Sequence, residues 1–305
     1  MRRAVRIALV ALLLGGCVGK PAPEREIRIA TGSPTAVYYA IGNALARLID
    51  EEMPGTKARV LVTAASAENV QLIEKGQAEI GFSQADVLVS GGTSVPSMVA
   101  LARVYDDLLH LVVRADSPIR TLEDLRGKRV SIGAAGSGTV VTVRRLFTVA
   151  GLAKPGAVDK QQLGLDDSVK ALTSGQIDAF FFSGGLPVSG IKELSATSKT
   201  RLIDLSKWAG DLRKAYSDVY VVRDVPTSAY QMPAVATVGV PNLLVVSASM
   251  PDDEAYELTK LLMTRRDVLA SAHPAAERLD IRSAIATEPV PLHPGAARYY
   301  QGIKP

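Results

Sequence analysis

The segment Lys75-Gly76-Gln77-Ala78-Glu79-Ile80-Gly81-Phe82 is similar to a segment 99 residues later, Ser174-Gly175-Gln176-Ile177-Asp178-Ala179-Phe180-Phe181. In both segments a glycine ends a helix. An acidic residue then stands one place inside an otherwise apolar strand, and such continuous apolar strands are typical of buried parallel sheets. Each segment therefore predicts a helix that leads into a strand of a parallel sheet.

The match extends towards the N-terminal side of both segments. The first copy predicts strands at 27–30, 59–62 and 78–82 and helices at 38–49 and 67–75. The second copy predicts strands at 129–133, 161–165 and 177–182 and helices at 139–150 and 168–174. Any two βαβ units look somewhat alike, but here three successive elements match in order at offsets near 100. The pattern favours two similar α/β lobes joined by hinge strands, a bilobal periplasmic-binding-protein-like fold.

A later apolar strand at 238–246 and a helix from Pro251 to Met263 bring the chain back to its first half. We expect lobe one to comprise residues 26–113 plus 241–305 and lobe two residues 114–240. The hinge strands are expected near Val112-Val113 and Leu243-Leu244.

The N-terminus predicts export. Arg2, Arg3 and Arg6 precede an apolar run at 7–14, and Leu14-Gly15-Gly16-Cys17 follows with the look of a bacterial lipobox. The run is too short to cross a bilayer, which needs about 20 residues. We interpret 1–17 as a lipoprotein signal peptide with Cys17 as the lipidated residue, and 18–25 as a tether. The protein is then anchored by lipid at the periplasmic face of a bacterial membrane.

Composition excludes several classes of function. Without Arg2, Arg3 and Arg6 the chain has 32 Lys and Arg against 31 Asp and Glu, so its basic charge gives no case for nucleic acid. Cys17 is the only cysteine, so no disulfide framework is expected. The three histidines stand without a catalytic or metal-binding motif. We expect no enzyme activity, no cofactor and no metal.

One turn has the composition of an anion site. The segment 133–139, Gly-Ala-Ala-Gly-Ser-Gly-Thr, follows a predicted strand and opens a predicted helix. Free N–H groups and the positive helix end converge at such a turn, and Ser137, Gly138 and Thr139 allow close approach of a carboxylate. The alternative is an ordinary tight turn with Thr139 as the helix cap.

The equivalent positions of lobe one are also polar. Ser66 either caps the helix that follows or faces a ligand, and Asn69 lies on its first turn. Gln84 ends a buried strand, where α/β folds place binding residues, whereas Asp86 is interpreted as a helix cap. Of Tyr38 and Tyr39, one is expected in the core and the other at the cleft; the spacing does not say which.

Taken in order, these motifs resemble the TAXI family of TRAP-transporter solute receptors. The resemblance covers residues 27 to about 300 and includes the segments 110–114, 125–131, 136–139, 175–181 and 290–296. It implies a receptor that closes on a small carboxylate, a glutamate-like amino acid or a 2-oxoacid, and delivers it to a TRAP-type permease. The cleft residues that it implies are Tyr39, Ser66, Asn69, Gln84, Ser137, Gly138, Thr139 and Ser183. The first loop departs from the family pattern, because Pro34 and Val37 stand where glycine-rich sequence is usual.

Two other functions compete with this interpretation. A sensory or scaffolding lipoprotein would use the same cleft, so the sequence does not separate it from a transport receptor. A surface-anchored hydrolase is disfavoured because catalytic motifs are missing. We expect a monomer.

Overall fold

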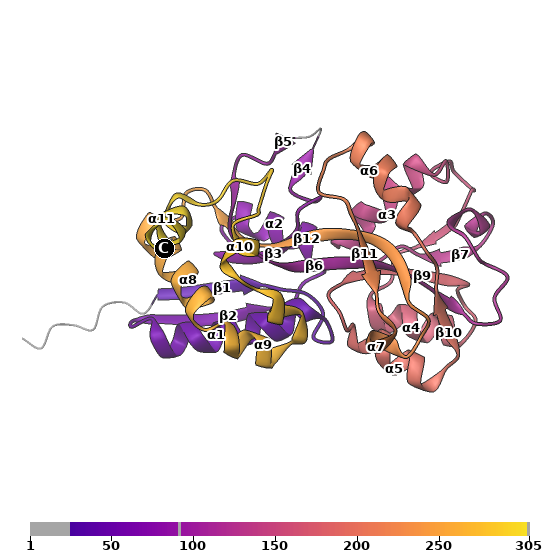
Figure 1. The fold of residues 1–305 in the computed structure, drawn as a ribbon, viewed down its shortest axis with the longest axis horizontal. Coiled ribbons are helices and arrows are strands. Elements are labelled where there is room, and N and C mark those ends of the chain that lie inside the picture. The colour runs from indigo at the N-terminus through magenta and orange to yellow at the C-terminus, as the bar shows by residue number, and fades with distance from the viewer. Residues whose placement is uncertain (1–24, 91–92, 304–305) are drawn as a thin grey trace, which may run out of the picture.

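One mixed sheet of ten strands runs through the whole molecule, and its strand order defines two lobes (Figure 1). The computed structural model describes residues 25–90 and 93–303; the predicted signal peptide, Cys17 and nearly all of the tether lie outside them. Lobe one contains β2 (Thr56–Leu61), β1 (Arg25–Ala30) and β3 (Ile80–Gln84), and lobe two contains β8 (Asp159–Gln161), β7 (Arg129–Ser131) and β9 (Ala179–Gly184). Between them lie β6 (Met98–Arg114) and β12 (Val235–Ser247), which belong to both lobes.

The two lobes repeat one topology. Lobe one places α1 (Val37–Glu52) after β1 and α2 (Ser66–Glu74) after β2; lobe two places α3 (Gly138–Val149) after β7 and α4 (Leu165–Thr173) after β8. In each lobe the first strand pairs in parallel with the other two. The third strand pairs antiparallel with a shared strand, β3 with β12 and β9 with β6. The predicted α/β fold of two similar lobes is confirmed.

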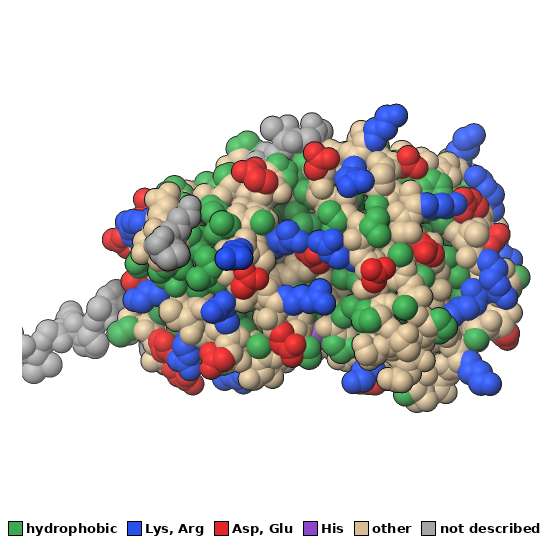
Figure 2. All heavy atoms as spheres, in the orientation of Figure 1, with side chains coloured by type: hydrophobic (Ala, Val, Ile, Leu, Met, Phe, Trp, Pro, Cys, Tyr) green, Lys and Arg blue, Asp and Glu red, His purple; other side chains and the backbone are tan. Residues whose placement is uncertain are grey.

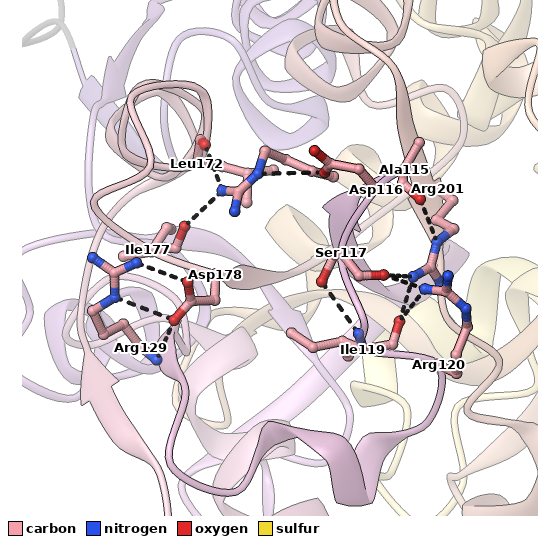
Figure 3. Close-up of polar contacts among 11 residues, drawn as sticks. Ala115, Asp116, Ser117, Ile119, Arg120, Arg129, Leu172, Ile177, Asp178 and Arg201 are labelled. Atoms are coloured by element: carbon pink, nitrogen blue, oxygen red, sulfur yellow. Dashed lines mark hydrogen bonds and ion pairs between the residues drawn. The ribbon is translucent and has the colours of Figure 1, made fainter.

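The acidic residue of the sequence repeat has the same partner type in both lobes. Glu79 Oε2 accepts hydrogen bonds from the backbone N–H and the Nε of Arg28, at 2.6 and 3.1 Å. Asp178 Oδ2 accepts the same two bonds from Arg129, at 2.9 and 3.2 Å (Figure 3). Each carboxylate therefore ties the third strand of its lobe to the first, which explains an acidic residue at this place in the repeat.

Apolar side chains fill both faces of the sheet. On one face of lobe one, α1 packs with α8 (Asp252–Thr264) and α11 (Pro294–Gly302). On the corresponding face of lobe two, α4 packs with α5 (Ser189–Thr197) and α7 (Thr227–Tyr230). On the other side, side chains of α2, α3 and α6 (Ala209–Ala215) form one apolar cluster that continues from lobe to lobe.

The remaining elements are short and lie at the edges or in connections: β4 (Val89–Ser90), β5 (Thr93–Ser94), β10 (Thr200–Leu202), β11 (Val221–Val225), α9 (Arg266–Ala272), α10 (Ile281–Ala284), and three 3₁₀ helices, η1 (Leu122–Leu125), η2 (Ser206–Trp208) and η3 (Pro274–Arg278). No helix in the ranges 25–90 and 93–303 has both the length and the apolar character that a bilayer crossing requires.

The strand predicted at 161–165 is wrong. β8 ends at Gln161, and α4 begins at Leu165 after the N-cap Gly164, whose carbonyl accepts the Ser168 N–H at 2.9 Å. Leu163 and Leu165 are spaced two apart, like the apolar residues of a strand. Leu165 is instead the first residue of α4, and its side chain enters the core of lobe two.

The hinge near Val112-Val113 stays a prediction, and the strand partners of β6 change before this point. β6 pairs with β12 from Met98 to Leu108 and already pairs with β9 from Leu108 onward. Two irregularities in the register of β6 with β12, next to Leu243 and Leu244, coincide with the passage from lobe one. Because bulges bend and twist strands, we infer that the chain bends at this passage.

Glu79→Gln is expected to lower the free energy of unfolding at pH 7 by about 1.5–3 kcal/mol, because it removes hydrogen bonds to a charged group. Asp178→Asn should act in the same direction and less strongly, since its partner Arg129 is 43% exposed. Denaturant unfolding of both variants measures this. Asp167→Asn, from the exposed pair with Lys170, is the control and should change little.

The loss should depend on pH. Burial alone would raise the pKa of Glu79, but its hydrogen bonds with Arg28 outweigh burial and hold that pKa below its usual value of 4.5. A carboxylate with a lowered pKa stabilises the fold above that range and loses its contribution as pH falls through the lowered value. The difference between wild type and Glu79→Gln should therefore shrink in acid; a difference that grows below pH 4.5 would contradict this pairing.

Candidate functional site

A cavity of about 100 Å³ lies between the lobes, where β1, β3, β7 and β9 reach their carboxyl ends. This is the edge at which α/β folds bind ligands. A single water needs about 10–15 Å³ by this kind of measure, so the cavity has room for several waters or for one small solute. Both lobes contribute to its wall: Gly32, Ser33, Tyr38, Ser66, Gln84, Tyr105 and Asp107 on one side, and Gly133, Ser137, Gly138, Thr139, Leu165, Phe182 and Ser183 on the other.

The N-termini of several helices from both lobes reach this cavity, those of α1 and α3 among them. α1 contributes Val37 and Tyr38, and its N-cap Ala36 has no side chain that could cap it. α3 contributes Gly138 and Thr139. Because the N-terminus of a helix carries partial positive charge, the two helices make the cavity favourable for an anion.

The N-terminal amides of α3 are available, whereas those of α2 are used. Ala67 N–H and Glu68 N–H of α2 both donate to the Gly136 carbonyl of lobe two, each at 3.1 Å. In α3 the N-cap Ser137 accepts only the Val140 N–H, at 3.3 Å. Among the described residues, the amides of Gly138 and Thr139 have no acceptor. The anion-binding capacity predicted for this turn is therefore unused by the protein itself.

The lobes touch each other around the cavity. Gln84 Nε2 donates to Ser183 Oγ at 2.5 Å, and these two residues hold equivalent positions in the repeat. Thr35 Oγ1 donates to Asp166 Oδ1 at 3.1 Å at another place on the rim. With the bonds from α2 to Gly136, these contacts describe a closed arrangement of the two lobes.

Buried polar groups surround the closed cavity, and several have no partner. Tyr38 OH donates to Asn242 Oδ1 and lies 3.1 Å from Ser66 Oγ, which in turn accepts the Gln84 N–H at 3.2 Å. Four atoms in this region lack a hydrogen-bond partner among the described residues: Gln84 Oε1, Tyr105 OH, Asp107 Oδ1 and Asn242 Nδ2. Because a buried polar atom is costly to leave unpaired, these atoms point to a ligand or to water in the cavity.

Burial sets the protonation of the groups at the cavity. It raises the pKa of Asp107 to about 7; the nearby amide groups of Asn242 and Gln84 oppose this rise, and the Asp86 and Asp106 carboxylates add to it. Burial lowers the pKa of His273, whose Nδ1 accepts the Ala275 N–H at 3.1 Å. The imidazole is therefore neutral near pH 7.

Six of the eight site residues expected from the sequence line this cavity: Ser66, Gln84, Ser137, Gly138, Thr139 and Ser183. Asn69 does not; it is fully buried, and its Nδ2 donates to the carbonyls of Thr31 and Phe82 at 2.7 and 2.8 Å. Tyr39 is half-buried outside the lining, and Tyr38 stands at the wall instead. Val37 of the unusual first loop also lines the cavity.

The three capping interpretations are wrong. The N-cap of α2 is Ala65, so Ser66 is free to bind the Gln84 amide. The N-cap of α3 is Ser137, and Thr139 Oγ1 accepts the Ser183 N–H at 3.1 Å. Asp86 lies in a turn that leads into β4, so no helix begins directly after it.

Asp86 instead joins the lobes. Its Oδ2 accepts hydrogen bonds from Thr142 Oγ1 of α3 at 2.6 Å and from Tyr220 OH at 3.0 Å. The Asp86 carbonyl accepts Arg145 Nη1 at 2.7 Å. Burial raises the pKa of this carboxyl group.

Sequence reasoning missed Tyr105, Asp107 and His273 as cavity residues. A signal for Asp107 exists, because Asp106 and Asp107 interrupt the apolar segment 98–113. In the strand their side chains point to opposite faces. Asp107 lines the cavity, and Asp106 accepts Arg103 Nε at 3.1 Å and Arg223 Nε at 2.7 Å.

The charged groove beside Asp106 is a weaker candidate. Figure 2 shows Lys and Arg side chains gathered over the junction between the lobes on one face. A groove of about 780 Å³ at the junction is lined by Arg103, Arg223 and Asp106, but these charges already pair with one another. Within the described ranges, no three or more His, Cys, Asp or Glu residues are grouped to hold a metal. His110 is a buried core residue whose Nε2 lies 2.9 Å from Tyr230 OH. Its burial lowers its pKa to about 4.

Comparison with solved structures places the fold among binding proteins. The chain is similar to the periplasmic aliphatic sulphonate binding protein SsuA of Escherichia coli (16% identity, 92% of this chain and 84% of that chain, TM-score 0.51). It is similar to a putative L-cystine ABC transporter protein of Listeria monocytogenes (14%, 81% and 94%, 0.55). A third similar structure is the alkanesulfonate-binding protein SsuA of Xanthomonas axonopodis pv. citri bound to MOPS (17%, 93% and 86%, 0.50). At these identities the likeness establishes the bilobal fold.

Sequence comparison establishes the family. Residues 29–303 match the NMT1-like family. This range includes both lobes and both shared strands. The chain therefore belongs to the NMT1-like family.

Proposed function

We propose that the protein is an extracytoplasmic solute receptor, which binds a small carboxylate between its lobes and delivers it to a membrane permease. The observation that carries this proposal is the cavity at the lobe junction, where helix N-termini from both lobes converge and the amides of Gly138 and Thr139 have no acceptor among the described residues. A carboxylate placed there would accept hydrogen bonds from these amides and be stabilised by the partial positive charge of the helix N-termini. The cleft that we propose consists of Ser66, Gln84, Ser137, Gly138, Thr139 and Ser183, with Tyr38 in the wall in place of Tyr39.

The proposed partner is a TRAP-type permease, on the strength of the motifs that resemble TAXI receptors. One of the similar solved structures, from Listeria monocytogenes, carries the name of an ABC transporter, which makes an ABC permease the alternative. Transport in cells that lack either an ion gradient or ATP separates the two. A sensory lipoprotein with the same cleft would bind the solute and support no uptake.

A thermal-shift screen with amino acids and organic acids, followed by calorimetry, tests binding. A ligand at 100 times its dissociation constant should stabilise the native protein by about 2.7 kcal/mol. Absence of any stabilisation across small carboxylates would contradict the proposal.

Gly138→Ala is expected to weaken binding by preventing full closure. A Cβ at residue 138 would lie 1.9 Å from Gln84 Oε1 and 2.7 Å from Ser66 Oγ, both in the other lobe. Since overpacking typically costs about 1–3 kcal/mol, affinity should fall about ten- to hundredfold. Calorimetry measures this loss.

Gly210→Ala in α6 is the matched control, because nothing lies within 4 Å of a Cβ at that helical glycine. It should leave affinity unchanged. If Gly138→Ala folds and binds as tightly as Gly210→Ala, the lobes do not close against each other at α3.

We also propose that Cys17 is lipidated and holds the receptor at the outer face of the cytoplasmic membrane or at the outer membrane. Cys17→Ser should release the protein from membranes or leave the signal peptide uncleaved. Membrane fractionation with lipid labelling measures both outcomes. A Cys17→Ser protein that is still labelled and membrane-bound would contradict the anchor.

A further inference from the structure

The cavity contains a carboxyl group and no cationic side chain. Among the described residues that line it there is no Lys and no Arg, and burial keeps the nearby His273 neutral. Positive potential comes from helix N-termini in the lining, those of α1 and α3 among them. Asp107 is the one acidic residue in the lining. An anion bound at the helix ends would therefore lie near the carboxyl group of Asp107. A solute whose only polar group is a carboxylate has no group that could pair with this acid.

Asp107 has no hydrogen-bond or ion-pair partner among the described residues that would explain its burial. It is 3% exposed, and its Oδ1 accepts no hydrogen bond from the described residues. Tyr38 and Tyr105, which face it, are phenols, and burial raises the pKa of both well above the usual value. The nearest charged groups along the chain and across the lobe, Asp106 and Asp86, are acidic as well. A buried acid in these surroundings requires a proton or a cation from outside.

Gln84 connects the acidic and the positive side of the cavity. It lines the cavity together with Asp107, and its amide group lies close enough to oppose the rise in the pKa of that carboxyl group. Its Oε1 lies against Gly138, at the N-terminus of α3. Gln84 is 1% exposed, and Oε1 has no donor among the described residues. One side chain therefore spans the distance between the carboxyl group and the free amides, so a small solute could reach both.

We propose that Asp107 and Gln84 Oε1 form a cation subsite next to the anion site of α3, so that the cavity selects a solute with a protonated amine close to its carboxylate. The α-ammonium of an amino acid donates to Asp107 and to Gln84 Oε1, and its carboxylate accepts the amides of Gly138 and Thr139. A 2-oxo acid offers a carbonyl oxygen at the same place, which cannot donate to either acceptor. This inference rests on the proposed function and chooses between its two solute classes.

Calorimetry with matched pairs tests the selection. L-glutamate with 2-oxoglutarate, L-alanine with pyruvate, and L-leucine with 4-methyl-2-oxopentanoate differ only in the amine. Charge-assisted hydrogen bonds should favour the amino acid of the bound pair by about tenfold or more. Asp107→Asn should lower the affinity for that amino acid about ten- to hundredfold and leave the 2-oxo acid as before or tighter.

Asp106→Asn is the matched control, because Asp106 is the neighbouring residue of β6 and its side chain pairs with Arg103 and Arg223 away from the cavity. It should retain the preference for the amine. Wild-type protein that binds both members of a pair equally, or prefers the 2-oxo acid, overturns the inference and leaves the receptor function standing. An Asp107→Asn protein that keeps the wild-type preference overturns it as well. Failure of these pairs and of every amino acid and organic acid in the thermal-shift screen contradicts the proposed function itself. The wild-type comparison remains decisive if Asp107→Asn does not fold.

Discussion

The pairing of β6 with β12 is the constraint on which the rest of the structure depends. Each strand belongs to both lobes, and they pair with each other from Met98 to Leu108 on β6. The backbone groups at the crossing are buried, so they must stay paired, and the lobes can move only by bending these two strands. The crossing also carries Tyr105 and Asp107 into the cavity wall. The hinge that we infer and the binding site that we propose therefore share residues of β6.

Closure and binding depend on the same atoms. α1 brings its N-terminus from lobe one and α3 brings its own from lobe two, so an anion in the proposed site would lie near both helix ends. Gln84 bonds to Ser183 across the cavity and lies against Gly138. On the α3 side of the junction, Asp86 holds Thr142 and Tyr220 in a buried network. Because these bonds cross from one lobe to the other, opening would break several of them together. A ligand that bridges the lobes would shift the equilibrium between open and closed forms towards the closed form.

The repeated part of the fold could be predicted from the sequence, because its signals are local. Glycines such as Gly76 and Gly175 take positive φ at helix ends, and the acidic residue of each copy follows at a fixed distance. The length of β6 could not be predicted, since a strand shared by two lobes has the same apolar pattern as two shorter strands. The choice of Tyr38 over Tyr39 and the role of Asp107 depend on contacts with Asn242 and Gln84, far away in sequence. The turn at Ser137, where we propose that an anion binds, could be predicted from the sequence because backbone geometry alone creates such a turn.

Small-angle X-ray scattering, with and without a saturating amino acid that calorimetry has shown to bind, tests the central claim most directly. If solute holds the lobes together across the cavity, the unliganded protein should have the larger radius of gyration, and the liganded curve should match the closed structure. Scattering from Gly138→Ala at the same solute concentration should stay nearer to the open form. Identical curves for wild type with and without bound solute, both different from the closed structure, would contradict closure around the ligand.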